Sequence, residues 1–197
     1  MKRNSHIRIA ILGGSFDPPT YGHLSMAKFA LYRMGFDEVW LMPAYRHTFD
    51  KQMSDFDHRL KMCYLLSEDD RIVPSDFQKT HDCDSSTLSL FKLLRKKFKK
   101  HDFYMIIGSD NANVIHKWIN YEELIKKVPF VVMERKGQEL NADVTWCLKN
   151  PHIYVKNLKA EEISSTIVRN AIKTGEPITK FTNSHIIKYI KKNNLYI

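Results

Sequence analysis

The sequence predicts an α/β fold in which helices flank a parallel sheet. Short apolar runs typical of buried strands alternate along the chain with amphipathic segments of helical period. Such alternation joins parallel strands through right-handed helical crossovers. Two glycine-containing turns, at residues 13–16 and 108–110, directly follow predicted strands. Both turns therefore fall at the carboxyl ends of the strands, where sheets of this kind bind ligands.

Each strand is predicted from a short apolar run that is bounded by polar or glycine-containing segments. The predicted strands cover residues 7–12, 39–42, 71–73, 103–107, 130–133 and, as an edge strand, 153–155. The run at 7–12 is apolar at nearly every position, which is typical of a strand that is buried on both faces. The strands therefore belong in the middle layer of the predicted fold.

The helices are predicted from apolar residues at helical spacing, together with residues that begin or end helices. The predicted helices cover residues 22–34, 57–66, 87–97, 121–127, 165–173 and 183–193. In the first of them, Leu24, Ala27 and Leu31 share one face, and Gly35 follows as a stop. Gly175 ends the helix at 165–173 in the same way.

Length and composition predict one domain over residues 1–197, with a small helical C-terminal subdomain from about residue 160. A hydrophobic content of 43% in 197 residues is enough for a substantial core. No run of about 18 apolar residues occurs, so no membrane span is expected. The basic start leads into a strand without a cleavage-site pattern, which predicts a cytoplasmic location without excluding a nuclear one. Three cysteines without metal-ligand spacing are expected to be reduced thiols: Cys63, Cys83 and Cys147.

The formal net charge of +9 suits a protein that binds anionic partners. Nucleic acids and nucleotides both fit this charge. The densest basic run, at residues 95–100, follows an apolar helical run and therefore sits at a helix C-terminus, where the helix dipole favours cations. We interpret it as a solvated helix end rather than a nucleic-acid patch. The polar stretch at 48–57 is predicted to be a mobile loop.

The most informative motif runs from Gly13 to His23 and reads Gly-Gly-Ser-Phe-Asp-Pro-Pro-Thr-Tyr-Gly-His. It places a glycine turn after a strand and a Thr-x-Gly-His step at the start of a helix. Free N–H groups and the helix dipole attract anions at a helix N-terminus, and His23 adds a donor in the first turn. Gly14 and Gly22 let the backbone approach a ligand closely. The motif predicts a phosphate site, although a Gly-Gly turn by itself is usually only a turn.

A second helix start, far along the chain, reads Ile163-Ser-Ser-Thr-Ile-Val-Arg169. Hydroxyl residues before an apolar periodic run are typical helix caps, and one hydroxyl is enough for a cap. Ser165 and Thr166 therefore keep hydroxyl and N–H groups for a second anion, and Arg169 supplies a guanidinium one turn later. Two helix N-termini with basic donors suit a polyphosphate better than a single phosphate.

Together the two motifs resemble the nucleotidyltransferase superfamily of Rossmann-like α/β enzymes. Further stretches in the same order resemble one branch, the nicotinate-nucleotide adenylyltransferases of bacterial type. These stretches lie at residues 42–44, 59–62, 86–88, 106–110, 117–118, 121–124, 130–137, 189–190 and 195–196. The resemblance covers essentially the whole chain and implies a Rossmann-like nucleotidyltransferase fold. It also implies transfer of AMP from ATP to nicotinic acid mononucleotide, which forms nicotinic acid adenine dinucleotide and pyrophosphate in NAD biosynthesis.

The resemblance also implies roles for individual residues. The residues it makes catalytic are His23, Thr20, Arg169 and Lys51. It implies ATP contacts at Gly14, Ser15, Phe16, Thr20, His23, Gly108, Asp110, Ile163, Ser165, Thr166 and Arg169. It places the mononucleotide at Trp118, Ile119, Arg135 and Ser85, with the pyridine ring stacked on the indole. The sequence shows no carboxylate cage, so no resident metal site is predicted, and Mg²⁺ is expected to arrive with ATP.

Several of these residues also fit ordinary structural positions. Asp110 suits an Asx-turn or a helix cap, Arg135 a surface position, and Trp118 a half-buried core position. The family differs from this chain at two points: it usually has His where this chain has Thr20, and Thr where this chain has Asp84. Thr at the first point is typical of phosphopantetheine adenylyltransferases, and Asp84 is an unexpected neighbour for a pyridine carboxylate.

Two alternative functions follow from these features. A phosphopantetheine adenylyltransferase would share Thr20 and both phosphate motifs, but the segment from Gly108 through Trp118 fits it poorly. An RNA-binding relative of the His-x-Gly-His tRNA synthetases would use the basic surface, but aromatic and lysine residues do not interleave on one face. We therefore expect ATP and nicotinic acid mononucleotide as partners, with no nucleic acid and no membrane. A homo-oligomer is compatible with the sequence.

Overall fold

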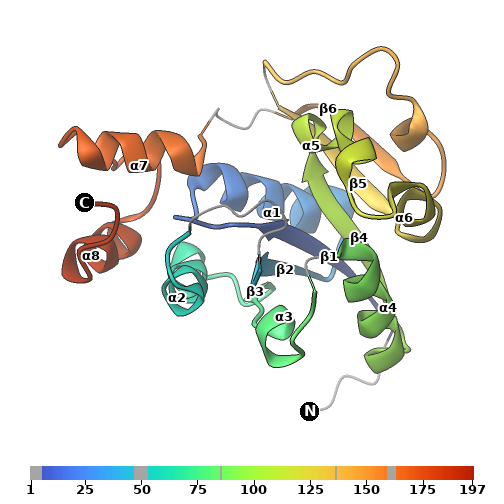
Figure 1. The fold of residues 1–197 in the computed structure, drawn as a ribbon, viewed down its shortest axis with the longest axis horizontal. Helices are drawn as coiled ribbons and strands as arrows, with labels where there is room; N and C mark the ends of the chain where they lie inside the picture. Colours follow the sequence, from blue (N-terminus) through green and yellow to red (C-terminus); the bar gives the residue numbers. More distant parts are fainter. Residues whose placement is uncertain (1–5, 47–52, 85, 136, 159–162) are drawn as a thin grey trace.

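The computed structural model describes residues 6–46, 53–84, 86–135, 137–158 and 163–197. This part of the chain is built around a six-stranded parallel sheet with the strand order β3-β2-β1-β4-β5-β6 (Figure 1). The strands are β1 (Ile7–Gly14), β2 (Glu38–Pro43), β3 (Ile72–Pro74), β4 (His101–Gly108), β5 (Phe130–Arg135) and β6 (Ile153–Leu158). The six predicted strands and the parallel sheet are confirmed, and β6 is an edge strand as predicted.

Helices cover both faces of this sheet. The longer ones are α1 (Tyr21–Met34), α2 (Phe56–Leu66), α4 (Thr87–Lys97), α6 (Tyr121–Lys127), α7 (Ser165–Lys173) and α8 (Ser184–Lys192). These correspond to the six predicted helices and have closely similar ends. Short elements that were not predicted are α3 (Phe77–Thr80), α5 (Ser109–Asn113) and the 3-10 turns Ile115–Lys117 and Trp146–Leu148. Such short elements hold too few apolar positions to show a helical period.

Two apolar clusters lie on opposite faces of the sheet, because successive side chains of a strand point to opposite sides. On β1, Ala10 and Leu12 belong to the cluster that α1, α2, α7 and α8 complete. Ile9 and Ile11 belong to the cluster that α4 and α6 complete. All four β1 side chains are buried. Figure 1 shows the sheet between these two groups of helices, which is the arrangement expected for an all-parallel sheet.

The C-terminal helices α7 and α8 pack into the same core as the sheet. Val168 of α7 and Ile186 of α8 are both fully buried in the cluster that contains Leu12. Asn183 caps α8 by accepting the N–H of Ile186 at 2.9 Å, and its amide donates to the carbonyl of Leu65 in α2 at 2.6 Å. The start of α8 is thereby tied to α2, at one end of the molecule (Figure 1).

The strand order reverses between β1 and β4, which are neighbours in the middle of the sheet. The chain runs outward from β1 to β2 and β3, and then outward in the other direction from β4 to β5 and β6. Such a switch point leaves a crevice at the carboxyl ends of the two central strands. Gly14 ends β1 and Gly108 ends β4. The two polar turns singled out in the sequence therefore meet at one edge of the sheet.

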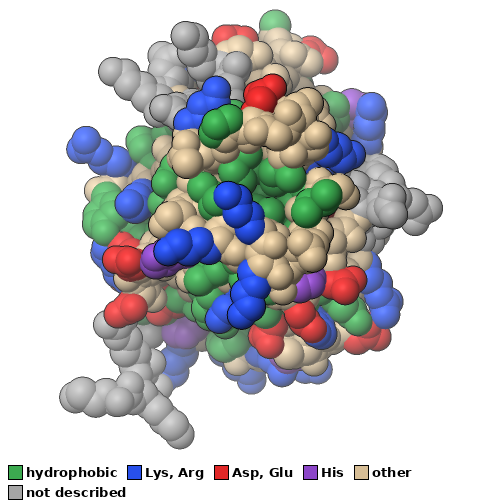
Figure 2. Space-filling view, turned by 90° about the vertical axis from the view of Figure 1, so that its left-hand side faces the viewer, with side chains coloured by type: hydrophobic (Ala, Val, Ile, Leu, Met, Phe, Trp, Pro, Cys, Tyr) green, Lys and Arg blue, Asp and Glu red, His purple; other side chains and the backbone are tan. Residues whose placement is uncertain are grey.

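The basic residues 95–97 occupy the last turn of α4, as predicted. Figure 2 shows the α7–α8 end of the molecule, where Lys and Arg side chains are spread out with acidic side chains among them. No helix in the described ranges is long and apolar enough to cross a membrane. Of the predicted loop at 48–57, residues 48–52 lie outside the described residues, and α2 begins at Phe56. Three cysteines are buried and free: Cys63, Cys83 and Cys147.

Candidate active site

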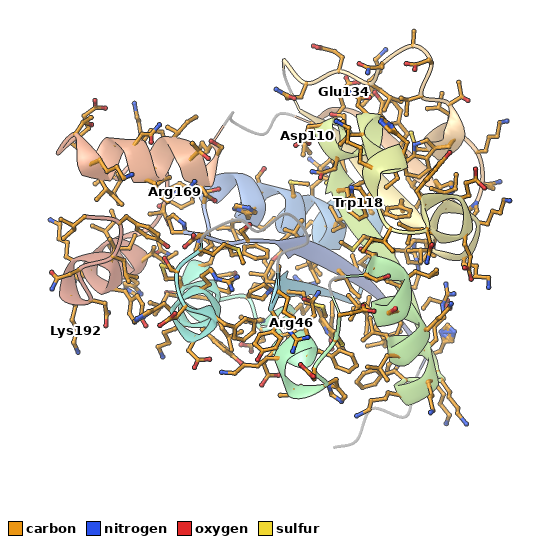
Figure 3. All side chains as sticks on the ribbon, in the orientation of Figure 1. Arg46, Asp110, Trp118, Glu134, Arg169 and Lys192 are labelled. Atoms are coloured by element: carbon orange, nitrogen blue, oxygen red, sulfur yellow. The ribbon has the colours of Figure 1, made fainter. Side chains whose placement is uncertain are left out.

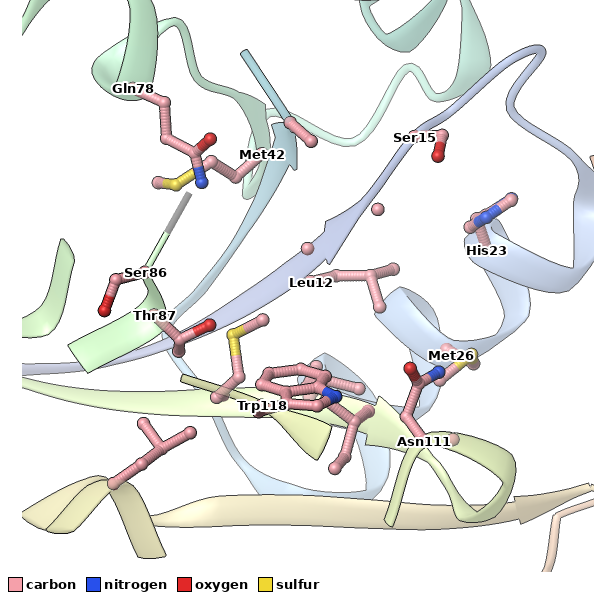
Figure 4. A pocket seen from close by; sticks show the side chains of 18 of the residues that line it. Leu12, Ser15, His23, Met26, Met42, Gln78, Ser86, Thr87, Asn111 and Trp118 are labelled. Atoms are coloured by element: carbon pink, nitrogen blue, oxygen red, sulfur yellow. The ribbon is translucent and has the colours of Figure 1, made fainter. Parts of the chain in front are cut away.

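A cavity of about 470 Å³ lies at the carboxyl ends of β1 and β4. Its volume is in the range that holds a small organic ligand. Figure 4 shows Ser15 and His23 at one end of the cavity and Trp118, Thr87 and Ser86 at the other, with Leu12 between them. Seven of the residues assigned to the site from the sequence line this cavity: Gly14, Ser15, His23, Gly108, Trp118, Ile119 and Ile163.

His23 is held in one orientation by the first turn of α1. The backbone N–H of Thr20, the N-cap residue, donates to Nδ1 of His23 at 3.1 Å, and the Thr20 hydroxyl lies 2.9 Å from the same nitrogen. A ring nitrogen that accepts a backbone N–H carries no proton, so the neutral imidazole has its proton on Nε2. The ring of Phe16 packs against the imidazole with 4.8 Å between centroids. The local structure therefore makes Nε2–H the donor of His23.

Thr20 and Phe16, the neighbours that support His23, are both buried. The Thr20 side chain is fully buried, and its hydroxyl oxygen also lies 3.5 Å from the carbonyl oxygen of Ile163. The structure thus shows Thr20 supporting the imidazole, whereas its contact with phosphate stays a prediction. Phe16 has a φ of 50°, a left-handed conformation that bulky residues rarely adopt and that turns the chain sharply after Ser15.

The turn between β1 and α1 is braced by side chains that donate to its carbonyl groups. The bonds run from Arg59 Nη1 to Ser15 O at 2.9 Å, from Arg169 Nη1 to Asp17 O at 2.7 Å, from Ser165 Oγ to Pro18 O at 2.8 Å and from Thr182 Oγ1 to Pro19 O at 3.1 Å. The donors come from α2, α7 and the segment before α8. Because these elements belong to the folded core, the turn is already ordered before a ligand binds.

The N-terminus of α7 combines a helix cap with contacts to this turn. Ser164 is the N-cap residue, and its hydroxyl accepts the N–H of Ile167 at 3.2 Å. Ser165 donates its hydroxyl to the turn, and the hydroxyl of Thr166 accepts Nη2 of Arg169 at 3.2 Å. The sequence left both hydroxyls for an anion, but the structure shows them bonded to protein groups. The assignment of Ser165, Thr166 and Arg169 to phosphates therefore stays a prediction.

Trp118 fits both interpretations that the sequence left open, a half-buried core position and a position that can contact a ligand. It follows the 3-10 turn Ile115–Lys117, is half-buried, and packs against the apolar cluster that α4 and α6 complete. It also lines the cavity, as does Ile119, which is 46% exposed. Figure 3 shows Trp118 and Asp110 on the β4 side of the molecule and Arg169 at the base of α7. The indole is therefore both part of the core boundary and available to a ligand.

Asp110 occupies the first turn of α5 rather than the cavity wall. Gly108 is the N-cap residue of this helix, and the amide of Asn111 donates to Oδ2 of Asp110 at 3.3 Å. Gly108 and Asn111 line the cavity, whereas Asp110 is not among the lining residues. The contact of Asp110 with a ribose stays a prediction.

The described lining residues carry basic but no acidic side chains. Arg46 brings a guanidinium to the wall, and none of these residues is Asp or Glu. Nη2 of Arg46 lies 2.7 Å from Oδ1 of Asp82 in an exposed ion pair. Asp84 is exposed and lies just before α4. Its carboxylate accepts hydrogen bonds from the N–H of Ser86 at 2.9 Å and from the hydroxyl of Ser89 at 3.1 Å. Asp84 is therefore not a wall residue that opposes an anionic ligand.

The structure leaves some predicted residues unplaced and adds others. Lys51, Ser85 and the side chain of Arg135 lie outside what the structure describes. Residues that line the cavity but were not assigned to the site include Arg46, Gln78 and Asn111. Gln78 sits on the one-turn helix α3, where its Oε1 accepts the N–H of Tyr45 at 3.1 Å, and no periodicity marks such a position. Asn111 could have been predicted as a site residue, because it lies three residues after the end of β4, where ligands bind in such a sheet.

The parallel sheet, the switch-point cavity and the histidine at a helix start together define an α/β nucleotidyltransferase. Residues 11–171 match the cytidylyltransferase-like family, so the chain belongs to that family. The chain is 32% identical to a probable nicotinate-nucleotide adenylyltransferase of Bacillus licheniformis, over 96% of this chain and 98% of the relative. It is 28% identical to the nicotinate-nucleotide adenylyltransferase of Bacillus subtilis over the same shares. Within its family, the chain falls among the nicotinate-nucleotide adenylyltransferases.

Solved structures agree with this placement. Plasmodium falciparum nicotinic acid mononucleotide adenylyltransferase complexed with NaAD matches with a TM-score of 0.83 at 27% identity, over 97% of this chain and 98% of the other. The same protein complexed with APC matches with a TM-score of 0.80. The predicted nucleotidyltransferase fold and enzyme class are thereby confirmed. These relatives favour the nicotinate-nucleotide branch over the phosphopantetheine and RNA-binding alternatives.

Proposed function

We propose that this chain joins AMP from ATP to nicotinic acid mononucleotide, forming nicotinic acid adenine dinucleotide and releasing pyrophosphate. The cavity at the β1–β4 switch point carries the proposal, since it has a donor end at His23 and an aromatic end at Trp118. Two nucleotides that meet through their phosphates need such a site, because their phosphates must lie together and each base needs an apolar face. The relatives named for this reaction support the same conclusion.

In the proposed reaction, an oxygen of the acceptor's 5′-phosphate attacks the α-phosphorus of ATP. The bond from that phosphorus to the oxygen bridging the α- and β-phosphates breaks, and pyrophosphate leaves with the electron pair. The protein forms no covalent intermediate, so it acts by positioning the substrates and stabilising charge. The Nε2–H of His23, oriented by Thr20, donates to an α-phosphate oxygen as negative charge develops there.

We assign the triphosphate to the end of the cavity nearest the starts of α1 and α7. The residues proposed to contact it are Gly14, Ser15, Phe16, Ser165, Thr166, Arg169 and, as a further contact, Lys51. Mg²⁺ enters as part of the MgATP substrate, whose phosphates supply the hard oxygen ligands that this ion prefers. The described residues include no group of three or more His, Cys, Asp or Glu side chains that could hold a metal ion. The adenosine then lies toward Gly108, Asp110 and Ile163.

The basic cavity wall favours the acid over the amide as the acceptor. The pyridine carboxylate adds a negative charge that nicotinamide mononucleotide lacks, and the guanidinium of Arg46 lies in the wall, where its ion pair with Asp82 is exposed to solvent. Arg135, Ser85 and Ile119 are the further acceptor contacts that we propose. Charge complementarity of this kind raises specificity, because the amide has no negative charge to attract the guanidinium.

The function is tested by incubating the protein with MgATP and each of three acceptors, and measuring pyrophosphate. The acceptors are nicotinic acid mononucleotide, nicotinamide mononucleotide and phosphopantetheine. We expect the highest kcat/KM with the acid. Faster release with phosphopantetheine than with either mononucleotide would contradict the proposal.

Replacing Trp118 by alanine is expected to raise KM for nicotinic acid mononucleotide about tenfold to a hundredfold, because stacking of a base on an aromatic ring contributes roughly 1–3 kcal/mol. KM for ATP is expected to change little. Trp146→Ala is the matched control, since this half-buried indole packs against Phe130 with 5.3 Å between centroids and does not line the cavity. Equal damage to both KM values in Trp118→Ala, as in a general loss of stability, would remove the indole from the acceptor site.

Replacing Arg169 by alanine is expected to weaken ATP binding and to slow turnover. The guanidinium orders the turn through the carbonyl of Asp17 and is proposed to contact the outgoing phosphates. Hydrogen bonds from charged groups contribute about 1.5–3 kcal/mol, which corresponds to an affinity loss of roughly tenfold or more. Calorimetric titration with ATP measures the loss directly. An unchanged ATP affinity in a folded Arg169→Ala protein would exclude Arg169 from the phosphate site.

A further inference from the structure

The carboxylate of Asp17 is buried behind the turn between β1 and α1 and is not among the cavity-lining groups. Its Oδ1 accepts the hydroxyl of Tyr196 at 2.7 Å, and its Oδ2 accepts the N–H of Ser54 at 3.2 Å. Arg59 supplies a nearby positive charge and donates to the carbonyl of Ser15 in the same turn. A buried carboxylate with donors on both oxygens holds the backbone that carries it in one position.

Tyr196 reaches Asp17 because the chain reverses sharply after α8. The N–H of Leu195 donates to the carbonyl of Ile190 at 3.1 Å, and Asn194 has a φ of 50°. This is a Schellman ending, with Asn194 in the left-handed position that follows the helix. Tyr196 itself has a φ of 68°, which bulky residues rarely adopt. Conformations of this kind persist where surrounding contacts impose them, and they often mark functional positions.

Asp17, the partner of Tyr196 in this hydrogen bond, is next to residues that form the His23 end of the cavity. Phe16, immediately before it, has a left-handed backbone and packs its ring against His23. The carbonyl of Asp17 accepts a hydrogen bond from the guanidinium of Arg169. Asp17 is therefore held through both its side chain and its backbone. Burial raises the pKa of the Tyr196 phenol above its ordinary value. The phenol therefore stays protonated in neutral solution and keeps donating to Asp17.

We propose that Tyr196 is a positioning residue for phosphate transfer, whose hydroxyl holds Asp17 and thereby holds the turn at residues 15–19 against the triphosphate. The inference rests on the proposed function, because ATP is the ligand whose phosphates this turn meets. It extends that function to a side chain 179 positions along the sequence from Asp17. The acceptor base lies at the other end of the cavity, so its binding does not depend on Tyr196.

The test is Tyr196→Phe, which removes only the hydroxyl and keeps the ring packed. We expect kcat to fall on the order of tenfold and the dissociation constant for ATP to rise severalfold, as for the loss of one hydrogen bond to a buried charge. KM for nicotinic acid mononucleotide is expected to stay unchanged. A role in stability alone would not produce this separation between the two substrates.

Tyr189→Phe is the matched control. Its hydroxyl lies 2.9 Å from Nδ1 of His58, so it also joins the C-terminal helix α8 to α2, but it does not touch the turn. We expect its kinetic constants to match those of the wild type. The proposal is overturned if both variants lose activity to the same extent, or if Tyr196→Phe leaves kcat and ATP affinity within about twofold of the wild type.

A double-mutant cycle tests whether Tyr196 acts through Asp17. Asp17→Asn is measured with and without Tyr196→Phe, and residues that act through one contact give non-additive effects. Full additivity of the two changes overturns the proposed route. ATP binding is measured by calorimetry without an acceptor. A wild type that binds ATP but shows no turnover therefore refutes the proposed reaction, while the effect of Tyr196→Phe on ATP affinity can still be measured. A wild type that binds no ATP refutes both.

Discussion

Replacing His23 by alanine is expected to lower kcat about 10²- to 10³-fold, the usual cost of removing one preorganised donor from a developing charge. The backbone N–H of Thr20 and the ring of Phe16 hold the imidazole in place, so its Nε2–H needs little reorganisation when the reaction begins. The substitution is expected to leave the fold intact, because the side chain lies at the cavity wall rather than in the core. Turnover is measured as pyrophosphate release at saturating substrates.

His116→Ala is a suitable control for this prediction. His116 is exposed and is not among the cavity-lining residues, so its loss is expected to change neither stability nor turnover. Thermal unfolding of both variants shows whether the fold is retained. A folded His23→Ala protein that turns over at nearly the wild-type rate would refute the role given to the imidazole.

Replacing Arg59 by methionine is expected to lower the free energy of unfolding by about 3–5 kcal/mol, because two hydrogen bonds from a charged group are lost and each contributes about 1.5–3 kcal/mol. Arg59 is 2% exposed, and its guanidinium donates to the carbonyls of Ser15 and Ser54 at 2.9 and 2.8 Å. Burial lowers the pKa of this guanidinium, and the carboxylate of Asp17 partly opposes that shift. The substitution leaves two carbonyls and the Asp17 carboxylate without this donor and charge, while methionine keeps the side-chain stem.

The expected loss corresponds to a fall in melting temperature of roughly 10 °C, since each kcal/mol shifts Tm by about 2–4 °C in a domain of this size. Arg71→Met is the control, because Arg71 pairs with Asp69 at 3.1 Å on the surface, where ion pairs add little to stability. Urea unfolding measures both variants. A similar small shift for Arg59 and Arg71 would show that the buried guanidinium does not hold the turn.

Much of the fold could be predicted because its signals are local. A helix or strand shows its period within about ten residues, and caps add further signals at the ends. Gly35, with a φ of 69°, ends α1, and Ser164 caps α7, as their residue types indicate. The one-turn helix α3 was missed because such a short segment has no period to detect. Consequently Gln78, which α3 carries to the cavity, was missed as well.

Part of the candidate site was predictable for a different reason. His23 and Trp118 belong to motifs that resemble a known family, and the structure places both residues in the cavity wall. The same resemblance assigned Ser165 to phosphate, which stays a prediction, and the structure adds that its hydroxyl donates to the carbonyl of Pro18. A motif indicates which residues occur together, whereas the direction of each hydroxyl depends on every acceptor around it.

By itself, the sequence determined the α/β class, the order of strands and helices along the chain, and the two helix starts. These properties depend on periodicity and on residues adjacent in the chain. Only the tertiary structure decided that side chains of α2 and α7 donate to the carbonyls of the turn between β1 and α1. It also decided that the hydroxyl of Tyr196 donates to Asp17 and that Arg46 lines the cavity. Such contacts join residues far apart in the sequence, and each forms only when the packed core brings its partners within hydrogen-bonding distance.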